Sequence, residues 1–418
     1  MIRHFGDGRD WFFSTRFGLF IHWGLYAIPG WHEQHQYRLR IPRREYAQLV
    51  GAFNPARFDP DAWLDLAAEV GMRYVCFTTK HCDGFCLWDT AHTDYNVMRT
   101  PYGKDVLGLL AAACHRRGFP LCLYYSIPDM HHPNYPNAGR SYELERPDPG
   151  DEPNLDQYIA FVKAQVRELC TNYGEIHGFW WDVNVIEHRD PSVNAIVREL
   201  QPQAVINNRG FDDGDFRTPE RDFDRPDRSA VLAFEHPTEA CQSVGAESWG
   251  YRADEDYCAD AHLIRSIDET LALGGNYLLN IGPRADGTFP PAGERILRAV
   301  GAWYRAVAEA FDGTAPASAL TTNREVFITR RGDTLYVHLS AVPSSTAVIL
   351  HPLAARPRRA ILLNTGAEVE TRVDLLPRFY AERTECLRLR NLPVNELSGT
   401  ALVVKLEFAP GVLPEAGE

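Results

Sequence analysis

The feature that most restricts the fold is the alternation of short apolar strands with helical patterns through the first three quarters of the chain. Residues 155–173 carry apolar side chains at three- and four-residue spacing, and an apolar, aromatic run from Gly178 to Asn184 follows them. Helices are expected over residues 59–70 and 105–117, because each stretch begins at a capping aspartate and ends before a glycine. Strands that alternate with helices pair in parallel, so the sequence predicts an α/β domain of parallel βα units.

Polar side chains follow the predicted strands at their C-terminal ends. They are His22, His81, Asp83, Asp129, Asp182, Asn208, Arg209 and Asn280. If the sheet closes into a barrel, these strand ends meet at one mouth, where barrel enzymes place their chemistry. We therefore expect an active site at this mouth, with Asp182 as a candidate nucleophile. The alternative for Asp182 is that it caps the next element or pairs with an arginine.

The sequence pattern changes near residue 315. Short apolar strands separated by turn residues follow over residues 325–329, 334–339, 347–350, 360–363 and 401–406. This pattern is typical of an antiparallel β-sandwich. We predict a catalytic α/β domain over residues 1–315 and a β-sandwich over residues 316–418. Within the first domain, residues 128–153 are expected to form a long functional loop and residues 208–250 an irregular, acidic region.

Charge and composition exclude some ligands and indicate a compartment. The net charge of −13 argues against nucleic acid, because phosphate binding requires a basic surface. The N-terminal residues show no secretory signal pattern, and no apolar run approaches the length that crosses a membrane. The nine cysteines are scattered and odd in number, as expected for buried thiols in a reducing compartment. We therefore expect a cytoplasmic protein with a neutral or weakly polar ligand.

Three sets of residues could indicate a metal site. Cys82 and Cys86 have a spacing found in zinc sites, but no second pair of that kind follows. His131 and His132 lie next to each other in a proline-rich loop, where histidines are more often solvated. A metal-dependent hydrolase that uses His22, His81 and Asp83 is a further alternative.

Seven segments, in the same order along the chain, resemble the α-L-fucosidases of glycoside hydrolase family 29. They read FGLFIHWG from Phe17, KHCDGF from Lys80, LYYS from Leu123, WWD from Trp180, GDFRTPE from Gly214, SWGY from Ser248 and GNYLLNIGP from Gly275. One such segment is weak evidence, whereas seven in order are specific. The resemblance covers roughly residues 11–340 and implies a distorted (β/α)8-like, TIM-type barrel followed by a C-terminal β-sandwich. It also implies retaining hydrolysis of terminal α-L-fucosides without a metal or organic cofactor.

The resemblance implies roles for individual residues. Asp182 is similar to the nucleophile, and the expected substrate-binding residues are His22, Glu33, His81, Cys82, Trp180, Arg209 and Trp249. Retaining hydrolysis needs a second carboxyl group as acid and base, about 5 to 5.5 Å from the first. Family members differ in where this group lies, so Glu220 and Glu239 are both candidates, with Glu220 favoured. The other is expected to be a solvated glutamate in an acidic loop.

Three positions depart from the family pattern. The family usually has a histidine where this chain has Cys82, a tryptophan where it has Gln34, and a glycine where it has Val183. The usual Asn-Gly-Glu signature is also altered near residues 305–311. Since cysteine is a weak hydrogen-bond donor, these changes leave open which sugar hydroxyls are recognised. A hydrolase of a related L-sugar glycoside and a non-catalytic fucose-binding barrel are therefore alternatives. The expected partner is a fucosylated glycan or small glycoside, with no nucleic acid or membrane, and homo-oligomers are possible.

Overall fold

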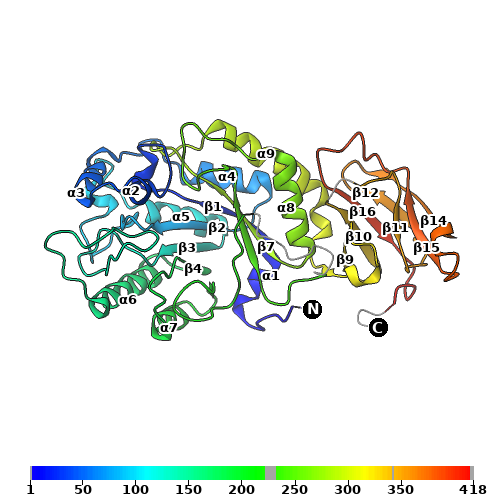
Figure 1. Cartoon of the computed structure of the whole chain (residues 1–418), viewed down its shortest axis with the longest axis horizontal. Helices are drawn as coiled ribbons and strands as arrows, with labels where there is room; N and C mark the ends of the chain where they lie inside the picture. The colour runs from blue at the N-terminus through cyan, green and yellow to red at the C-terminus, as the bar shows by residue number, and fades with distance from the viewer. Residues whose placement is uncertain (1, 222–231, 341–342, 415–418) are drawn as a thin grey trace.

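The computed structural model describes residues 2–221, 232–340 and 343–414. A parallel sheet surrounded by helices occupies one end of the elongated molecule, and antiparallel sheets occupy the other (Figure 1). No helix among the described residues is both long and apolar enough to cross a lipid bilayer.

The N-terminal sheet has seven parallel strands in the order β5-β4-β3-β2-β1-β7-β6. Their bounds are β1 Phe17–Ile21, β2 Val75–Lys80, β3 Leu121–Ser126, β4 Gly178–Asp182, β5 Val205–Ile206, β6 Glu239–Ser243 and β7 Asn276–Ile281. Every neighbouring pair is parallel, so all C-terminal strand ends lie on the same side of the sheet.

An irregular segment, residues 215–221, lies between the two edge strands β5 and β6. Parallel bridges join Asn207 to Phe216 on one side, and Arg217 to Thr238 and Glu220 to Cys241 on the other. Backbone hydrogen bonds run across both junctions, from the Cys241 N–H to the Pro219 carbonyl at 3.0 Å, for example. Residues 215–221 thus take the place of an eighth strand and close the sheet into a barrel. We call them the closing segment. This arrangement confirms the predicted distorted (β/α)8-like barrel.

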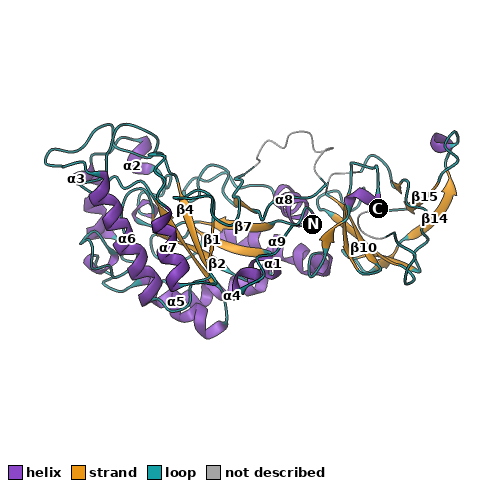
Figure 2. Cartoon of the chain, turned by 90° about the horizontal axis from the view of Figure 1, so that it is seen from below, coloured by secondary structure: helices purple, strands orange, loops and turns teal. Residues whose placement is uncertain are grey.

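Helices pack on the outside of this sheet (Figure 2). They are α4 Pro60–Val70, α5 Val106–Arg117, α6 Leu155–Asn172, α7 Pro191–Leu200, α8 Asp260–Ala272 and α9 Pro291–Val307. Shorter helices are α1 Trp11–Thr15, α2 His35–Arg38 and α3 Arg43–Tyr46, and 3-10 turns span Gly8–Asp10, Leu25–Ala27, Ala47–Ala52, Val97–Arg99, Ala308–Ala310, Ser318–Leu320 and Pro377–Phe379. The ends of α4 follow the predicted signals, because Asp59 accepts from the first backbone N–H groups and Gly71 adopts φ +93°.

Alternate residues of each strand face two different cores. One lies between the sheet and its helices and includes Trp181. The other fills the barrel interior and includes Phe20, Tyr124 and Trp180. Because successive side chains of a strand point to opposite faces, the adjacent Trp180 and Trp181 belong to different cores. Only Trp180 therefore lies below the mouth of the barrel.

The C-terminal part contains two antiparallel sheets. The first has the order β13-β12-β16-β10-β9-β8 and the second the order β11-β15-β14. The strands are β8 Ala315–Pro316, β9 Phe327–Arg331, β10 Thr334–Leu339, β11 Val348–Leu350, β12 Arg359–Leu362, β13 Ala367–Glu368, β14 Glu370–Leu375, β15 Glu385–Arg390 and β16 Leu402–Glu407. Apolar residues of both sheets form a shared core, which confirms the predicted β-sandwich. The domain boundary at residue 315 stays a prediction.

A buried polar cluster joins the sandwich to the barrel. Asp268 on α8 accepts from the Nδ1 of His338 on β10 at 2.8 Å and from the Oγ of Ser340 at 2.5 Å. His338 Nε2 lies 3.0 Å from the hydroxyl of Thr329, and both His338 and Asp268 are fully buried. The two parts therefore share a hydrogen-bond network.

The prediction for residues 208–250 is wrong in part, because β6 lies within this range. The strand reads Glu-Ala-Cys-Gln-Ser and has no apolar pattern, yet all five residues are buried. Pairing with β7 and with residues 217–221, rather than hydrophobicity, makes it a strand. The short apolar run at residues 230–234, within this range of the sequence, lies partly outside the described residues.

Candidate active site

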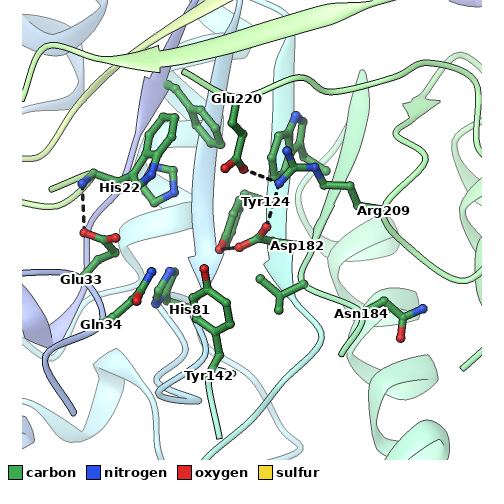
Figure 3. Close-up of a pocket in the computed structure, with 14 residues that line it drawn as sticks. His22, Glu33, Gln34, His81, Tyr124, Tyr142, Asp182, Asn184, Arg209 and Glu220 are labelled. Atoms are coloured by element: carbon green, nitrogen blue, oxygen red, sulfur yellow. Dashed lines mark hydrogen bonds and ion pairs between the residues drawn. The ribbon is translucent and has the colours of Figure 1, made fainter. Parts of the chain in front are cut away.

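A cavity of about 290 Å³ opens at the C-terminal ends of the barrel strands (Figure 3). Its walls are made by Phe20, His22, Glu33, Gln34, His81, Tyr124, Tyr142, Trp180, Asp182, Val183, Asn184, Arg209, Glu220 and Trp249. Eight of the residues that the sequence predicted for the site are therefore in one place. Cys82 and Glu239 do not line the cavity.

Asp182, the last residue of β4, faces this cavity (Figure 3). Its Oδ2 accepts a hydrogen bond from the Tyr124 hydroxyl at 2.5 Å, and its Oδ1 lies 3.3 Å from Arg209 Nη1. Burial raises the pKa of Asp182, while the charge of Arg209 and the hydrogen bond from Tyr124 oppose this rise. The pairing with an arginine that the sequence left open is thus present, but it lies inside the cavity.

Val183, directly after Asp182, has a strained backbone. Its φ is +55°, in the left-handed region that β-branched residues rarely adopt. Strain of this kind costs about 1 to 3 kcal/mol and is concentrated at functional sites. The turn at Val183 takes the chain out of the sheet immediately after the carboxylate.

Arg209 connects Asp182 to Glu220. Its Nη1 forms ion pairs with both carboxylates. Thr218 fixes the guanidinium, because it accepts from Nε at 2.5 Å through its hydroxyl and from Nη2 at 2.6 Å through its carbonyl. The group also lies 4.9 Å from the centre of the Trp180 ring. Since one nitrogen contacts both carboxylates, their nearest oxygens are separated by at most two hydrogen-bond lengths, about 6 Å.

The two carboxylates differ in their access to water. The Asp182 side chain is 13% exposed and the Glu220 side chain is 40% exposed. Glu220 lies on the closing segment, residues 215–221, at the rim of the cavity. Asp182 lies deeper, at the end of a regular strand.

Glu239 is the first residue of β6 and is buried inside the barrel. Its Oε2 accepts from the Tyr74 hydroxyl at 2.7 Å and its Oε1 from Trp180 Nε1 at 3.1 Å. Burial raises the pKa of Glu239 to about 7, against the effect of these two donors. The expectation that this glutamate is solvated is wrong, because β6 carries it into the barrel interior. There it accepts a hydrogen bond from Trp180 and does not line the cavity.

His22 and His81 are buried and uncharged at neutral pH. Burial lowers the pKa of His22 well below its usual value and that of His81 to about 4. The amide of Asn280 donates to Ser243 Oγ and to the Trp249 carbonyl, so its oxygen, 2.7 Å from His22 Nδ1, is an acceptor. Nδ1 therefore carries the proton in this network, and Nε2 of His22 is left as an acceptor.

Glu33 has one oxygen held by the protein and one available to a ligand. Its Oε2 accepts from Ser248 Oγ at 2.7 Å and from the backbone N–H groups of Trp249 and Gly250 at 2.9 and 3.3 Å. Its Oε1 is buried and has no hydrogen-bond partner among the described residues. A buried carboxylate oxygen without a partner in a cavity wall is suited to accept from a ligand hydroxyl.

Two polar strand-end residues point away from the cavity. Asp83 accepts from the Tyr46 hydroxyl at 3.0 Å and from the Phe85 N–H, and Asp129 pairs with the buried Lys80 at 2.9 Å. Their positions after β2 and β3 in the sequence do not bring them to the site. In the described part of the chain, no three His, Cys, Asp or Glu side chains come together as a metal site.

Six cavity residues were not among the site residues predicted from the sequence. They are Phe20, Gln34, Tyr124, Tyr142, Val183 and Asn184. Tyr124 lies in one of the seven matching segments, and Gln34 and Val183 were noticed only as departures. Tyr142 belongs to the loop of residues 128–153, whose length was the only signal of a functional role.

Comparison with known proteins agrees with this geometry. The family model described as α-L-fucosidase matches residues 7–309. The tissue α-L-fucosidase of Homo sapiens is 26% identical over an alignment of 401 residues, which covers 87% of this chain and 82% of that protein. The similarity therefore extends over most of both chains.

Solved structures give the same result. The α-L-fucosidase isoenzyme 1 from Paenibacillus thiaminolyticus is 33% identical, with a TM-score of 0.85 over 96% of this chain and 99% of that one. A Bacteroides thetaiotaomicron α-L-fucosidase of family GH29, trapped as a covalent intermediate with 2-fluoro-fucosyl fluoride, is 26% identical with a TM-score of 0.79 and covers 97% of each chain. From its sequence, its fold and the residues around its cavity, the chain belongs to the α-L-fucosidase family, GH29.

Proposed function

We propose that this protein hydrolyses terminal α-L-fucosides with retention of anomeric configuration, with Asp182 as the nucleophile and Glu220 as the acid and base. The observation that carries the proposal is the contact of one Arg209 nitrogen with both carboxylates. Retaining glycosidases need their two carboxyl groups about 5 to 5.5 Å apart, and inverting enzymes need a longer separation. The limit of about 6 Å set by Arg209 favours retention.

In the first step, a carboxylate oxygen of Asp182 attacks the anomeric carbon while the bond from that carbon to the leaving oxygen breaks. Glu220, in its acid form, gives its proton to the leaving oxygen. In the second step, Glu220 takes a proton from water, the water oxygen attacks the anomeric carbon, and the ester to Asp182 breaks. The exposure of Glu220 suits this role, since it must meet both the leaving group and water.

The walls of the cavity suit a neutral sugar. His22 and His81 are uncharged at neutral pH, and Glu33 has a buried oxygen available to a hydroxyl group. Trp180 and Trp249 offer apolar surface to the C5-methyl side of a 6-deoxy sugar. The volume is near the lower end for small-molecule pockets, which suits one terminal sugar ring.

Glu239 has no place in this mechanism. Both of its oxygens accept hydrogen bonds from Tyr74 and Trp180, and the residue does not line the cavity. We therefore assign the acid and base role to Glu220.

The test uses 4-nitrophenyl α-L-fucoside with wild-type protein, Asp182→Gly and Glu220→Gly. We expect Asp182→Gly to lose turnover and to regain it with azide, which fits the space of the carboxylate and attacks the anomeric carbon. On an alkyl α-L-fucoside, whose leaving oxygen needs a proton, Glu220→Gly should lose roughly a hundred- to ten-thousandfold in kcat, and less on the 4-nitrophenyl substrate. Full activity of Asp182→Gly would refute the assignment, and binding of fucose without any hydrolysis by wild type would favour a sugar-binding barrel instead.

Two further properties are part of the proposal. Cys82 and Gln34 replace residues usual in the family, so the fucoside should be compared with the corresponding α-L-galactoside, which would reveal a preference for a related L-sugar. We also propose a reducing, cytoplasmic location. Its support is that Cys76, Cys82, Cys86, Cys114, Cys122, Cys170, Cys241 and Cys386 are buried thiols that form no disulfide within the described chain.

A further inference from the structure

Tyr142 enters the cavity from a long loop between β3 and α6. It belongs to the loop of residues 128–153, which contains no helix or strand. Figure 3 shows its ring entering the cavity from the side opposite Glu220, with the hydroxyl directed toward Asp182. The hydroxyl therefore lies beside the carboxylate to which the anomeric carbon would become attached.

The loop around Tyr142 is built to hold this side chain in place. Glu143, which is buried, accepts from the Tyr135 hydroxyl at 2.6 Å, from the Ala138 N–H at 3.0 Å and from the Arg140 side chain at 2.8 Å. Because all these contacts converge on the residue after Tyr142, the loop has a defined conformation at this point.

The backbone and ring of Tyr142 carry further evidence of a positioned group. Its φ is +64°, a conformation that costs a non-glycine residue roughly 1 to 2 kcal/mol. The ring stacks on Tyr37 with 5.8 Å between centroids and 20° between planes. The strain and the stacking together turn the ring inward, and strain retained in this way is typical of functional sites.

Among the described residues, none forms a hydrogen bond with the hydroxyl of Tyr142. Asp182 and Glu33 line the same cavity. A phenol group held in a polar cavity without a partner is available to donate to a ligand.

Cys82 gives this donor a function. The family usually has a histidine at this position, but the Cys82 thiol is buried outside the cavity lining, 3.4 Å from His81 Nδ1. The thiol is a weak donor and does not reach the ligand space. The wall beside Asp182 therefore lacks the polar group that a histidine at position 82 would bring near it.

We propose that the Tyr142 hydroxyl donates a hydrogen bond to the sugar hydroxyl on C2, next to the anomeric carbon, and so replaces the donor that Cys82 does not supply. This inference rests on the proposed function. The C2 hydroxyl is the sugar hydroxyl nearest to the atom that Asp182 attacks, so a group beside Asp182 can reach it. Arg209 and Glu220 lie on the other flank of Asp182, and Glu33 and His22 line the cavity farther away.

Hydrogen bonds to this hydroxyl strengthen in the transition state of glycoside hydrolysis. Tyr142 is therefore a specificity-determining residue that acts on kcat and on recognition of the sugar at C2. It comes from a loop and not from the strand ends, so the same barrel can recognise the substrate with a different set of side chains.

The test measures kcat/KM for 4-nitrophenyl α-L-fucoside and for its 2-deoxy analogue. In Tyr142→Phe, which keeps the ring and its stacking on Tyr37, kcat/KM for the fucoside should fall roughly ten- to a hundredfold. For the 2-deoxy substrate the same variant should equal wild type within about twofold, because the acceptor is already absent. Tyr37→Phe, the same change on the ring outside the cavity, should leave both substrates unaffected.

An equal loss on both substrates, or no loss on either, would overturn the inference. These outcomes are distinct from failure of the proposed function. If wild type does not hydrolyse the fucoside, or if Asp182→Gly keeps full activity, the fucosidase mechanism itself is wrong. If wild type and Asp182→Gly behave as expected and only Tyr142→Phe shows no selective loss, the role of Tyr142 alone is refuted.

Discussion

Replacing Glu239 by glutamine should stabilise the protein in a pH-dependent manner. Glu239 is only 3% exposed, and burial raises its pKa from 4.5 to about 7. Between these pH values the folded protein binds more protons than the unfolded chain, so the contribution of Glu239 to stability is full below pH 4.5 and is lost as the pH rises through 7. The difference between the two pKa values corresponds to about 3 kcal/mol.

Glutamine has the same shape as a protonated glutamic acid and does not titrate. Its oxygen can accept from Trp180 Nε1, and its amide can donate to the Tyr74 oxygen, so both present contacts are retained. The free energy of unfolding of Glu239→Gln should therefore equal that of wild type near pH 4.5 and exceed it by about 3 kcal/mol at pH 8.

The assay is urea unfolding of wild type and Glu239→Gln at pH 5, 6.5 and 8, followed by tryptophan fluorescence. Glu199→Gln, at an exposed position on α7, is the matched control and should show no pH-dependent difference. A constant difference across pH, or a variant that loses stability as the pH rises, would refute the reasoning about the buried carboxyl. The variant should also keep most of its turnover, since Glu239 does not line the cavity.

Two further substitutions test features of the structure. Val183 has φ +55°, so Val183→Gly should be more stable than Val183→Ala by about 1 kcal/mol in thermal or urea unfolding. At a position with a negative φ, the glycine variant is the less stable of the two. A less stable Val183→Gly would therefore mean that the turn is not strained. Asp268→Ala removes the acceptor of both His338 and Ser340 and should cost about 3 kcal/mol of stability, because two buried donors lose their partner, while kcat of the folded enzyme is unchanged. An unaltered midpoint of unfolding would show that this network does not hold the barrel to the sandwich.

The parts of the fold that follow local rules were predictable from the sequence. The helix α4 begins and ends as its signals require, with the Asp59 cap and Gly71 in the left-handed conformation. By contrast, β6 and the closing segment, residues 215–221, contain no apolar periodicity from which they could be predicted. Their conformation depends on the pairing that closes the barrel. The strand β14 was missed for a related reason: it carries charged residues whose contacts, such as Asp374 with Arg388 at 2.7 Å, form only across the sheet.

The candidate site also contains residues that were predictable from the sequence and residues that were not. Asp182, His22 and His81 could be found because polar residues at the ends of parallel strands converge on one mouth. Tyr142 could not, since its place in the cavity depends on a positive φ and on a ring contact with Tyr37, more than a hundred residues earlier in the chain. The prediction for Glu239 was wrong for another reason. An acidic residue near other acidic residues in the sequence was expected to be in water, and it lies inside the barrel.

The residues proposed as nucleophile and as acid are carried by backbone of very different regularity. Asp182 ends a strand whose five residues all pair with residues of β3. Glu220 belongs to the closing segment, residues 215–221, which is joined to its neighbours by isolated bridges. The backbone of residues 215–221 still bonds to both neighbours, for example from the Arg221 N–H to the Cys241 carbonyl at 2.8 Å, so an exchange there must keep these contacts. Directed evolution of leaving-group preference should therefore begin with side chains of this closing segment, where the proposed proton donor can be moved while the proposed nucleophile keeps its place.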